Sequence, residues 1–348
     1  MLFKKINLFF FFLIFLTFFS FSVNSKYLFK GKHELEVKSK LENKITNGDS
    51  STSSFIKATI LNKTLLPKNA SAQQGITSDK IGNYYISENK IHKGVFVSKI
   101  VKLDKNLSQI RNEFILNPKK IKIWDTHNYK PHVGQVAIDQ NTNLIYVPLM
   151  DIGTPKLKMI FGKFFGFITG KLEVYGKKTA LLVFDSNLNY LSYIDWTNIS
   201  SYLDAIDIDN GKIWYDCGYI GVLKLSELEN IKNKKINIIK YYLNRKDISK
   251  AQGLKVSNNS LFYVPENDAL SNRTKKKYWG VLNFEISNLK NSRFSRKINY
   301  PTIVHSFSIP EKDADLEAMD FVIGSTEEIY ITTANDQGRN IYKVKLNF

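Results

Sequence analysis

Polar side chains recur at one position of a phrase that is repeated along this chain, and their types could bind a ligand or carry out acid–base chemistry. Each phrase begins with one or two polar or small residues and continues as an apolar alternation. The polar residues are Gln74, Gln135 or the nearby His132, Asp204, Gln252 and Glu317. If these positions are equivalent, they form a polar ring that contains two carboxylates.

Three kinds of chemistry fit such a ring. Asp204 and Glu317 could act as acid and base, with His132 as a general base. The same two carboxylates could hold calcium, which takes 6–8 oxygen ligands. Gln74, Gln135 and Gln252 could bind a ligand through their amides. The alternative is a hydrated rim without a function. We interpret His305, in an outer strand, as structural.

The repeated phrase predicts the elements that position these residues. Each copy is followed by an aromatic-rich strand, then by a third strand and, in most copies, a fourth. The second strands are Asn83–Ile86, Leu144–Pro148, Lys212–Tyr215, Leu261–Pro265 and Glu328–Ile331. Period-2 alternation with β-branched and aromatic residues indicates strands rather than helices. Four-stranded units repeated at intervals of tens of residues predict an all-β propeller.

The two ends of the chain predict how the ring closes. The fifth repeat ends after its third strand, 342–346, and an unassigned strand, 55–61, precedes the first repeat. Pairing these two would close a five-bladed ring and remove an exposed edge. A sixth blade is the alternative if 26–74 or 104–126 contains a degenerate repeat. The tight turns 105–107 and 186–188 each offer an asparagine, Asn106 and Asn187, for a left-handed backbone position.

The repeat phrases resemble those of a broad group of secreted propeller enzymes. The shared features are Gln-Gly or Glu-Ala before an apolar alternation, followed by Tyr-Val-Pro at 146–148 and 263–265. The group is gluconolactonase-like, strictosidine-synthase-like and phytase-like esterases, and the likeness covers roughly 72–348. It implies a divalent cation at the channel mouth and a carboxylate or histidine that assists hydrolysis. Asp204 and Glu317 match the acidic positions in kind, whereas the other repeats offer glutamine.

The N-terminal residues predict entry into the secretory pathway. Lys4 and Lys5 precede an apolar run over 8–23, and small residues follow up to Ser25. This pattern is typical of a signal peptide cleaved after residue 25. An uncleaved anchor through 8–23 is the alternative, although the run is shorter than the roughly 20 residues of a spanning helix. Residues 26–53 are predicted to be a polar flexible leader, and 54–348 a single propeller domain with insertions at 151–178 and 267–278.

Secretion makes the glycosylation pattern relevant. Acceptor sequences occur at Asn62, Asn69, Asn106, Asn198, Asn258 and Asn272. Cys217 is the only cysteine, so the chain has no internal disulfide, and we interpret this thiol as a small buried side chain.

Composition restricts the partners. The formal net charge is +18, which favours anionic lipid, polyanions or acidic glycans. The apolar, lysine-flanked segment 156–171 could contact a membrane surface or cover the channel. The basic residues do not cluster with exposed aromatic residues, so we expect no nucleic-acid partner. We also expect a monomer.

Two functions remain: binding of a ligand, glycan or protein at the channel mouth, or metal-assisted hydrolysis of esters, lactones or phosphoesters.

Overall fold

The computed structural model describes the chain from Ser54 to Phe348 with several internal gaps. The described ranges are 54–92, 95–116, 131–151, 178–233, 236–243, 250–265, 279–290, 298–307, 316–333 and 339–348. Residues 53–270 and 277–348 form one compact unit, which contains every described strand. The predicted signal peptide and leader lie outside the described residues, as do the segment 156–171 and most of both predicted insertions.

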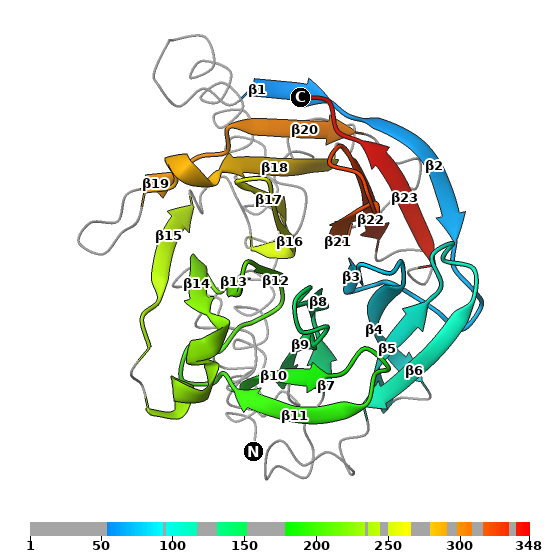
Figure 1. The fold of residues 1–348 in the computed structure, drawn as a ribbon. Coiled ribbons are helices and arrows are strands. Elements are labelled where there is room, and N and C mark those ends of the chain that lie inside the picture. Colours follow the sequence, from blue (N-terminus) through cyan, green and yellow to red (C-terminus); the bar gives the residue numbers. More distant parts are fainter. Residues whose placement is uncertain are drawn as a thin grey trace, which may run out of the picture. The chain divides into compact units, whose positions relative to one another are not determined.

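The unit is a five-bladed β-propeller, as predicted (Figure 1). Its five sheets surround a central axis, and the innermost strand of each is the one that begins with the repeated phrase. Blade 1 contains β3 (Gly75–Ser78), β4 (Tyr84–His92), β5 (Val95–Leu103) and β6 (Ile110–Leu116). Blade 2 contains β7 (Pro131–Val133), β8 (Ala137–Ile138), β9 (Ile145–Asp151), β10 (Thr179–Phe184) and β11 (Tyr190–Asp195).

The other three blades follow the same order from the axis outward. Blade 3 contains β12 (Ile206–Asp209), β13 (Lys212–Asp216), β14 (Ile220–Lys224), β15 (Ile239–Leu243) and β19 (Ile298–Asn299), with the 3-10 helix η1 (Leu225–Asn233) between β14 and β15. Blade 4 contains β16 (Ala251–Ser257), β17 (Ser260–Pro265), β18 (Trp279–Glu285), β20 (Ile303–Phe307) and β1 (Ser54–Lys57), with the short 3-10 helix η3 (Ile286–Asn288) after β18. Blade 5 contains β21 (Leu316–Phe321), β22 (Glu328–Thr333), β23 (Asn340–Lys345) and β2 (Thr59–Leu65).

The N-terminal segment closes the ring across two blades. β2 pairs antiparallel with β23, so an N-terminal strand supplies the missing fourth strand of blade 5, as predicted. The predicted pairing of 55–61 with the C-terminal strand is wrong for its first half, because β1 instead pairs in parallel with β20 of blade 4. The backbone N–H of Ala58 bonds Ser306, and the chain crosses there from blade 4 to blade 5. The segment therefore completes blade 5 and also ties it to blade 4.

Hydrophobic layers between neighbouring blades form the core. Five buried clusters each combine residues of two adjacent blades, so every blade is packed on both faces. The second strands are almost wholly buried, which explains their continuous apolar runs. Outer strands such as β6 consist mainly of solvent-exposed and half-buried residues. The described residues contain no sixth blade, and no described helix is long and apolar enough to cross a membrane.

Aspartates shape the tight turns of the first two blades. Asp104 and Asp185 each accept backbone N–H groups from the residues that follow, which closes the β5–β6 and β10–β11 hairpins. The left-handed residues of these turns are Leu107 (φ 58°) and Leu188 (φ 62°). The expectation that the preceding asparagines would take this conformation is therefore wrong. In both turns the left-handed residue is the leucine that follows the asparagine, within the loop that the aspartate caps.

Candidate functional site

The polar residue that begins a repeat lies where the inner strand is irregular. In blade 4 the register between β16 and β17 shifts between Ala251 and Gly253, so Gln252 is the extra residue. In blade 5 the register shifts between Leu316 and Ala318, which makes Glu317 the extra residue. A bulge turns a side chain out of the regular alternation of a strand. In blades 4 and 5 the repeated phrase is therefore a bulge at the start of the inner strand.

The small residue after it allows the inner strands to approach each other closely. A Cβ added to Gly75 would lie 2.5 Å from Ser87 Oγ and 2.6 Å from the backbone nitrogen of Val136. In the second repeat the order is reversed, and a Cβ added to Gly134, which precedes Gln135, would lie 2.2 Å from the carbonyl oxygen of Asp204. Each pair of neighbouring inner strands is in contact around the ring. The Gln-Gly signature therefore has a packing role that is separate from any chemistry.

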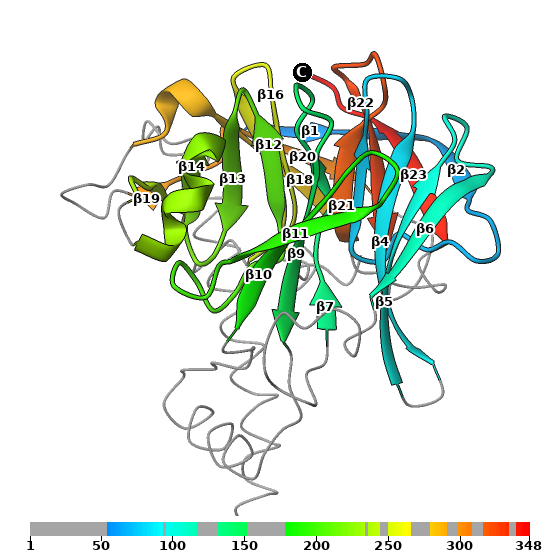
Figure 2. The ribbon, with the colours of Figure 1, turned by 60° about the horizontal axis from the view of Figure 1, so that its bottom comes forward.

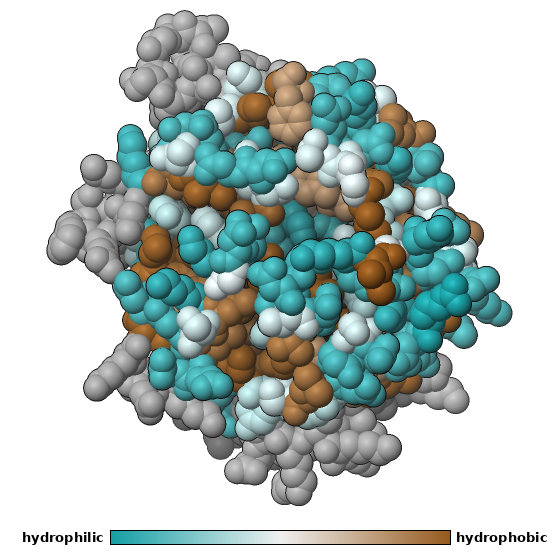
Figure 3. Space-filling view, in the orientation of Figure 1, coloured by the Kyte–Doolittle hydropathy of each residue, from teal (hydrophilic) through white to brown (hydrophobic). Residues whose placement is uncertain are grey.

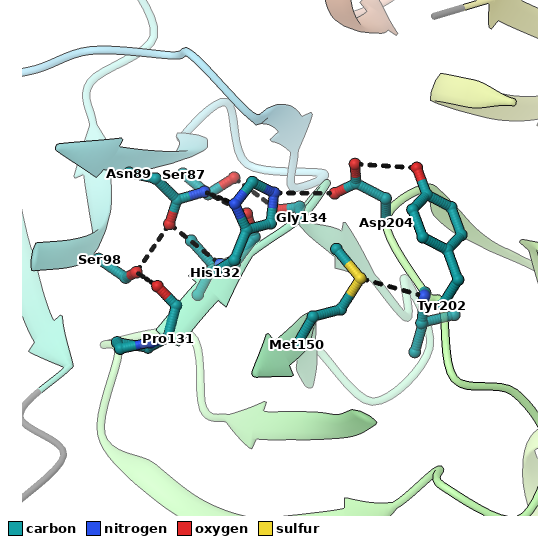
Figure 4. A network of polar contacts seen from close by, with 11 residues as sticks. Ser87, Asn89, Ser98, Pro131, His132, Gly134, Met150, Tyr202 and Asp204 are labelled. Atoms are coloured by element: carbon teal, nitrogen blue, oxygen red, sulfur yellow. Dashed lines mark hydrogen bonds and ion pairs between the residues drawn. The ribbon is translucent and has the colours of Figure 1, made fainter. Parts of the chain in front are cut away.

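His132 and Asp204 meet across the junction of blades 2 and 3 (Figure 4). His132 lies on β7, and its Nε2 is 3.7 Å from Asp204 Oδ1. Asp204 lies just before β12, and its Oδ2 accepts a hydrogen bond of 3.3 Å from the Tyr202 hydroxyl. The His132 side chain is 21% exposed and the Asp204 side chain 7%, so the pair can be reached from solvent on the histidine side.

Asn89 of blade 1 determines the tautomer of His132. Its Oδ1 accepts hydrogen bonds from the Val133 backbone N–H and from Ser98 Oγ, and its Nδ2 donates to the Val133 carbonyl. These bonds leave one orientation for the amide, so Nδ2 also donates to His132 Nδ1 at 3.3 Å. Nδ1 must accept this bond, which places the proton of the neutral ring on Nε2, facing Asp204.

Asp204 uses less of its hydrogen-bonding capacity than other buried aspartates. Asp79, Asp207 and Asp216 each accept at least one bond of 2.7 Å from a backbone N–H. The contacts of Asp204 are at 3.3 and 3.7 Å, although the residue is only 5% exposed. A buried carboxylate normally accepts several short bonds. Asp204 therefore has acceptor capacity that another donor could use.

The remaining predicted residues have different surroundings. Gln135 is buried, and its amide exchanges two hydrogen bonds with the backbone of Leu254 on blade 4, across the axis from blade 2. Gln74 and Gln252 are half-buried, and Glu317 is 7% exposed on blade 5. Glu317 is on blade 5 and Asp204 precedes the inner strand of blade 3, so blade 4 lies between the two predicted carboxylates. The roles proposed for these residues stay predictions.

A charged cluster that sequence reasoning missed lies further along the inner strands. Lys255 Nζ of blade 4 is 3.2 Å from Asp207 Oδ1 of blade 3 and 2.9 Å from Asp320 Oδ1 of blade 5. Ser78 Oγ of blade 1 donates to Asp320, and Gln140 Nε2 of blade 2 donates to the Ser78 carbonyl. This chain of polar contacts links all five blades around the axis. Asp207, Lys255 and Asp320 occupy the same position of the repeat, two residues after the small one, and that shared position is the signal that could have identified them.

Burial controls the protonation of this cluster. Desolvation raises the pKa of Asp207 to about 6, although Lys255 and the Val256 N–H oppose the shift. Burial alone would lower the pKa of Lys255, but Asp207 and Asp320 outweigh it and raise that pKa. The lysine therefore stays charged between the two aspartates.

The described residues do not fit the calcium site implied by the resemblance. They contain no group of three or more His, Cys, Asp or Glu side chains that could hold a metal ion. The neighbours of the Asp204 carboxylate are an imidazole N–H and a phenol, whereas calcium requires 6–8 oxygen ligands.

The face of the molecule seen in Figure 3 carries mainly hydrophilic side chains, with apolar patches between them.

Cys217 and the glycosylation acceptors also have defined environments. Burial raises the pKa of the Cys217 thiol to about 11, so it is a poor nucleophile at neutral pH. Asn69, Asn106, Asn198 and Asn258 are exposed in turns, and Asn62 is exposed on β2. Asn272 lies outside the described residues.

Comparison with known proteins shows no family for this chain. No family model matches the chain, and no curated protein matches its sequence. Solved propellers match its chain path, including the WD40 domain of Neurospora crassa Pan2 (12% identity, TM-score 0.37, 85% of this chain and 98% of that one). The α-L-arabinofuranosidase PaAbf62A from Podospora anserina matches with 9% identity and a TM-score of 0.44, over 84% and 97% of the two chains. A protein from Parabacteroides distasonis described as a glycoside hydrolase matches with 10% identity and a TM-score of 0.46, over 84% and 95%. At these identities and TM-scores the likeness transfers no activity, and the propeller assignment rests on the chain's own five sheets.

Proposed function

We propose that this chain is a secreted or lumenal propeller that binds a small polar ligand, such as a glycan unit, at the channel mouth beside Asp204. One observation carries the proposal: Asp204 is 5% exposed, yet its nearest donors are 3.3 and 3.7 Å away. A ligand hydroxyl placed between the carboxylate and His132 would provide the short bond that the buried oxygen lacks.

The surrounding groups suit a ligand with hydroxyl groups. The His132 Nε2–H could donate to a ligand oxygen, while Asp204 and the oxygen of the Tyr202 hydroxyl accept from ligand hydroxyls (Figure 4). The Asn89 amide, which four hydrogen bonds hold in place, keeps the imidazole in one orientation. A preoriented site of this kind loses little conformational entropy on binding.

The test is a titration of the protein with a panel of neutral and acidic mono- and oligosaccharides, followed by calorimetry. We expect D204N to weaken binding by about 10- to 100-fold, because a charge-assisted hydrogen bond contributes on the order of 1.5–3 kcal/mol. The matched control is D209N, the same substitution at a half-buried residue at the end of β12, which should bind normally. Binding that is equal in wild type and D204N would contradict the proposal.

Hydrolysis of esters, lactones or phosphoesters remains the second candidate, because His132 and Asp204 lie together. A general base needs a free lone pair that faces the substrate. In His132 the lone pair of the neutral ring is on Nδ1, and the Asn89 amide already donates to it. The imidazole would have to lose this bond before it could act as a general base. Turnover of an ester or lactone that is lost in both D204N and H132Q would establish the enzyme and overturn the binding proposal.

A further inference from the structure

His305 is a buried histidine whose ring has no polar partner. It is 0% exposed in the middle of β20, and neither Nδ1 nor Nε2 has a hydrogen-bond partner within the described residues. Buried polar atoms in native proteins are nearly always hydrogen-bonded, so two orphan nitrogens on one side chain are exceptional. The ring is stable there only while it is neutral, because a buried imidazolium without a partner is costly.

The ring closure covers this histidine. On one side of β20, Ile56 of β1 is in register with His305, and on the other side Val281 of β18 is. The Phe348 ring packs edge-on to the imidazole, with 5.1 Å between the ring centroids. Asn347 Nδ2 also donates to the Lys57 carbonyl, at 2.6 Å, which ties the C-terminal tail to β1. His305 therefore lies beneath the place where both chain termini of the propeller join blade 4.

Among the described residues, no charged neighbour is placed to stabilise a protonated His305. β20 has no other charged residue, Lys57 of β1 and Glu285 of β18 are exposed, and Lys343 and Lys345 of β23 pair with Glu328 and Glu327. Phe348, whose ring packs on the imidazole, has no ionisable side chain. Burial is the one cause that lowers the pKa of His305, to about 4.

We propose that His305 makes the closure of the propeller an acid-sensitive latch, in which protonation of the imidazole releases β1 and the C-terminal tail from blade 4. The described sheets of blades 1–3 do not contain these segments, and β2 stays paired with β23, so release frees one end of the N-terminal segment while the five blades remain packed. The inference is independent of the ligand proposed beside Asp204.

Linkage gives the sign and size of the effect. The closed-state pKa is lowered, so the closed state is favoured at neutral pH, and this contribution is lost as pH falls from 6.5 towards 4. With a released-state pKa near 6.5, the equilibrium constant for opening rises on the order of 100-fold between pH 8 and pH 4. The buried Asp207, whose pKa is about 6, has the opposite dependence, since its neutral form is favoured in the fold.

The test measures the position of β1 by double electron–electron resonance. Spin labels are placed at Lys57 on β1 and at Leu191 on β11 in a C217S background, because these strands lie on opposite sides of the ring (Figures 1 and 2). We expect one narrow distance at pH 7.5 and a broad, longer distribution at pH 4. The sheet signal in far-ultraviolet circular dichroism should persist at both values.

The control is H305F, which fills the apolar site without a titratable group and should keep the narrow distance at pH 4. The proposal is overturned if the wild-type distance does not change at pH 4, if H305F opens like the wild type, or if opening coincides with loss of the sheet signal.

A second variant keeps the proposal testable if H305F does not fold. Phe348 is 61% exposed, so F348A should leave the core intact while it uncovers the imidazole. An NMR titration of the His305 ring should then show a pKa shifted from about 4 towards 6.5. An unchanged titration in F348A would show that the tail is not part of the latch.

Discussion

At the scale of single residues, the inner strands separate two kinds of polar group. Asp204 and His132, at the strand starts, keep long contacts and partial exposure, whereas Asp207, Lys255 and Asp320 satisfy one another within the ring. The first pair was predictable because aspartate and histidine near a repeated phrase suggest chemistry. The second cluster was not recognised, because a lysine inside a channel is explained only by the two carboxylates that neighbouring blades bring to it.

Removal of the lysine should strongly destabilise the propeller. K255M leaves two buried carboxylates without a counter-ion, and we expect a loss of about 3–5 kcal/mol in the free energy of unfolding, measured with urea. The triple variant D207N/K255M/D320N should recover most of this loss, because the amides keep acceptors for Val256 and Ser78. The control is K343M, whose partner Glu328 is 30% exposed, so its cost should stay below about 1 kcal/mol. Equal losses for K255M and the triple variant would contradict this view of the cluster.

At the scale of elements, the bulge and the small residue after it have separate roles. The bulge turns Gln252 and Glu317 out of the strand alternation, and the small residue lets the next inner strand approach. The repeat could be read from the sequence because both features recur. The second repeat shows the limit of such reading: Gln135 stands where the others have a small residue, and its amide bonds Leu254.

The close approach predicts a graded response to alanine. In G75A the new Cβ would meet backbone atoms of blade 2 at 2.6 and 2.8 Å, so we expect a loss of about 1–3 kcal/mol. In G253A the nearest backbone atom, of Ala318, is 3.0 Å away, and the loss should be smaller. Thermal unfolding of both variants under one set of conditions checks the order. A larger loss in G253A would refute the packing role assigned to the phrase.

At the scale of the whole molecule, closure depends on residues far apart in the chain. β2 covers the edge of β23, and β1 extends blade 4. A variant that begins at Leu66 lacks both strands, so β23 would become an exposed edge, and we expect loss of cooperative unfolding and aggregation. A variant that begins at Ser54 keeps every described strand and should remain a folded monomer. Size-exclusion chromatography and calorimetry distinguish them, and a soluble, cooperatively folded chain from Leu66 would contradict the role of the closure.

The sequence by itself determined the strands, their grouping into five repeats and the N-terminal strand needed for closure, because alternation and repetition are local properties of a chain. Only the tertiary structure decided that β1 crosses to blade 4, that His305 is buried beneath it, and which polar residues meet. Those outcomes depend on contacts between blades, where residues up to hundreds of positions apart become neighbours. The mouth beside Asp204 was identified as a region from the repeat, but its unused acceptor capacity follows from distances that no sequence pattern contains.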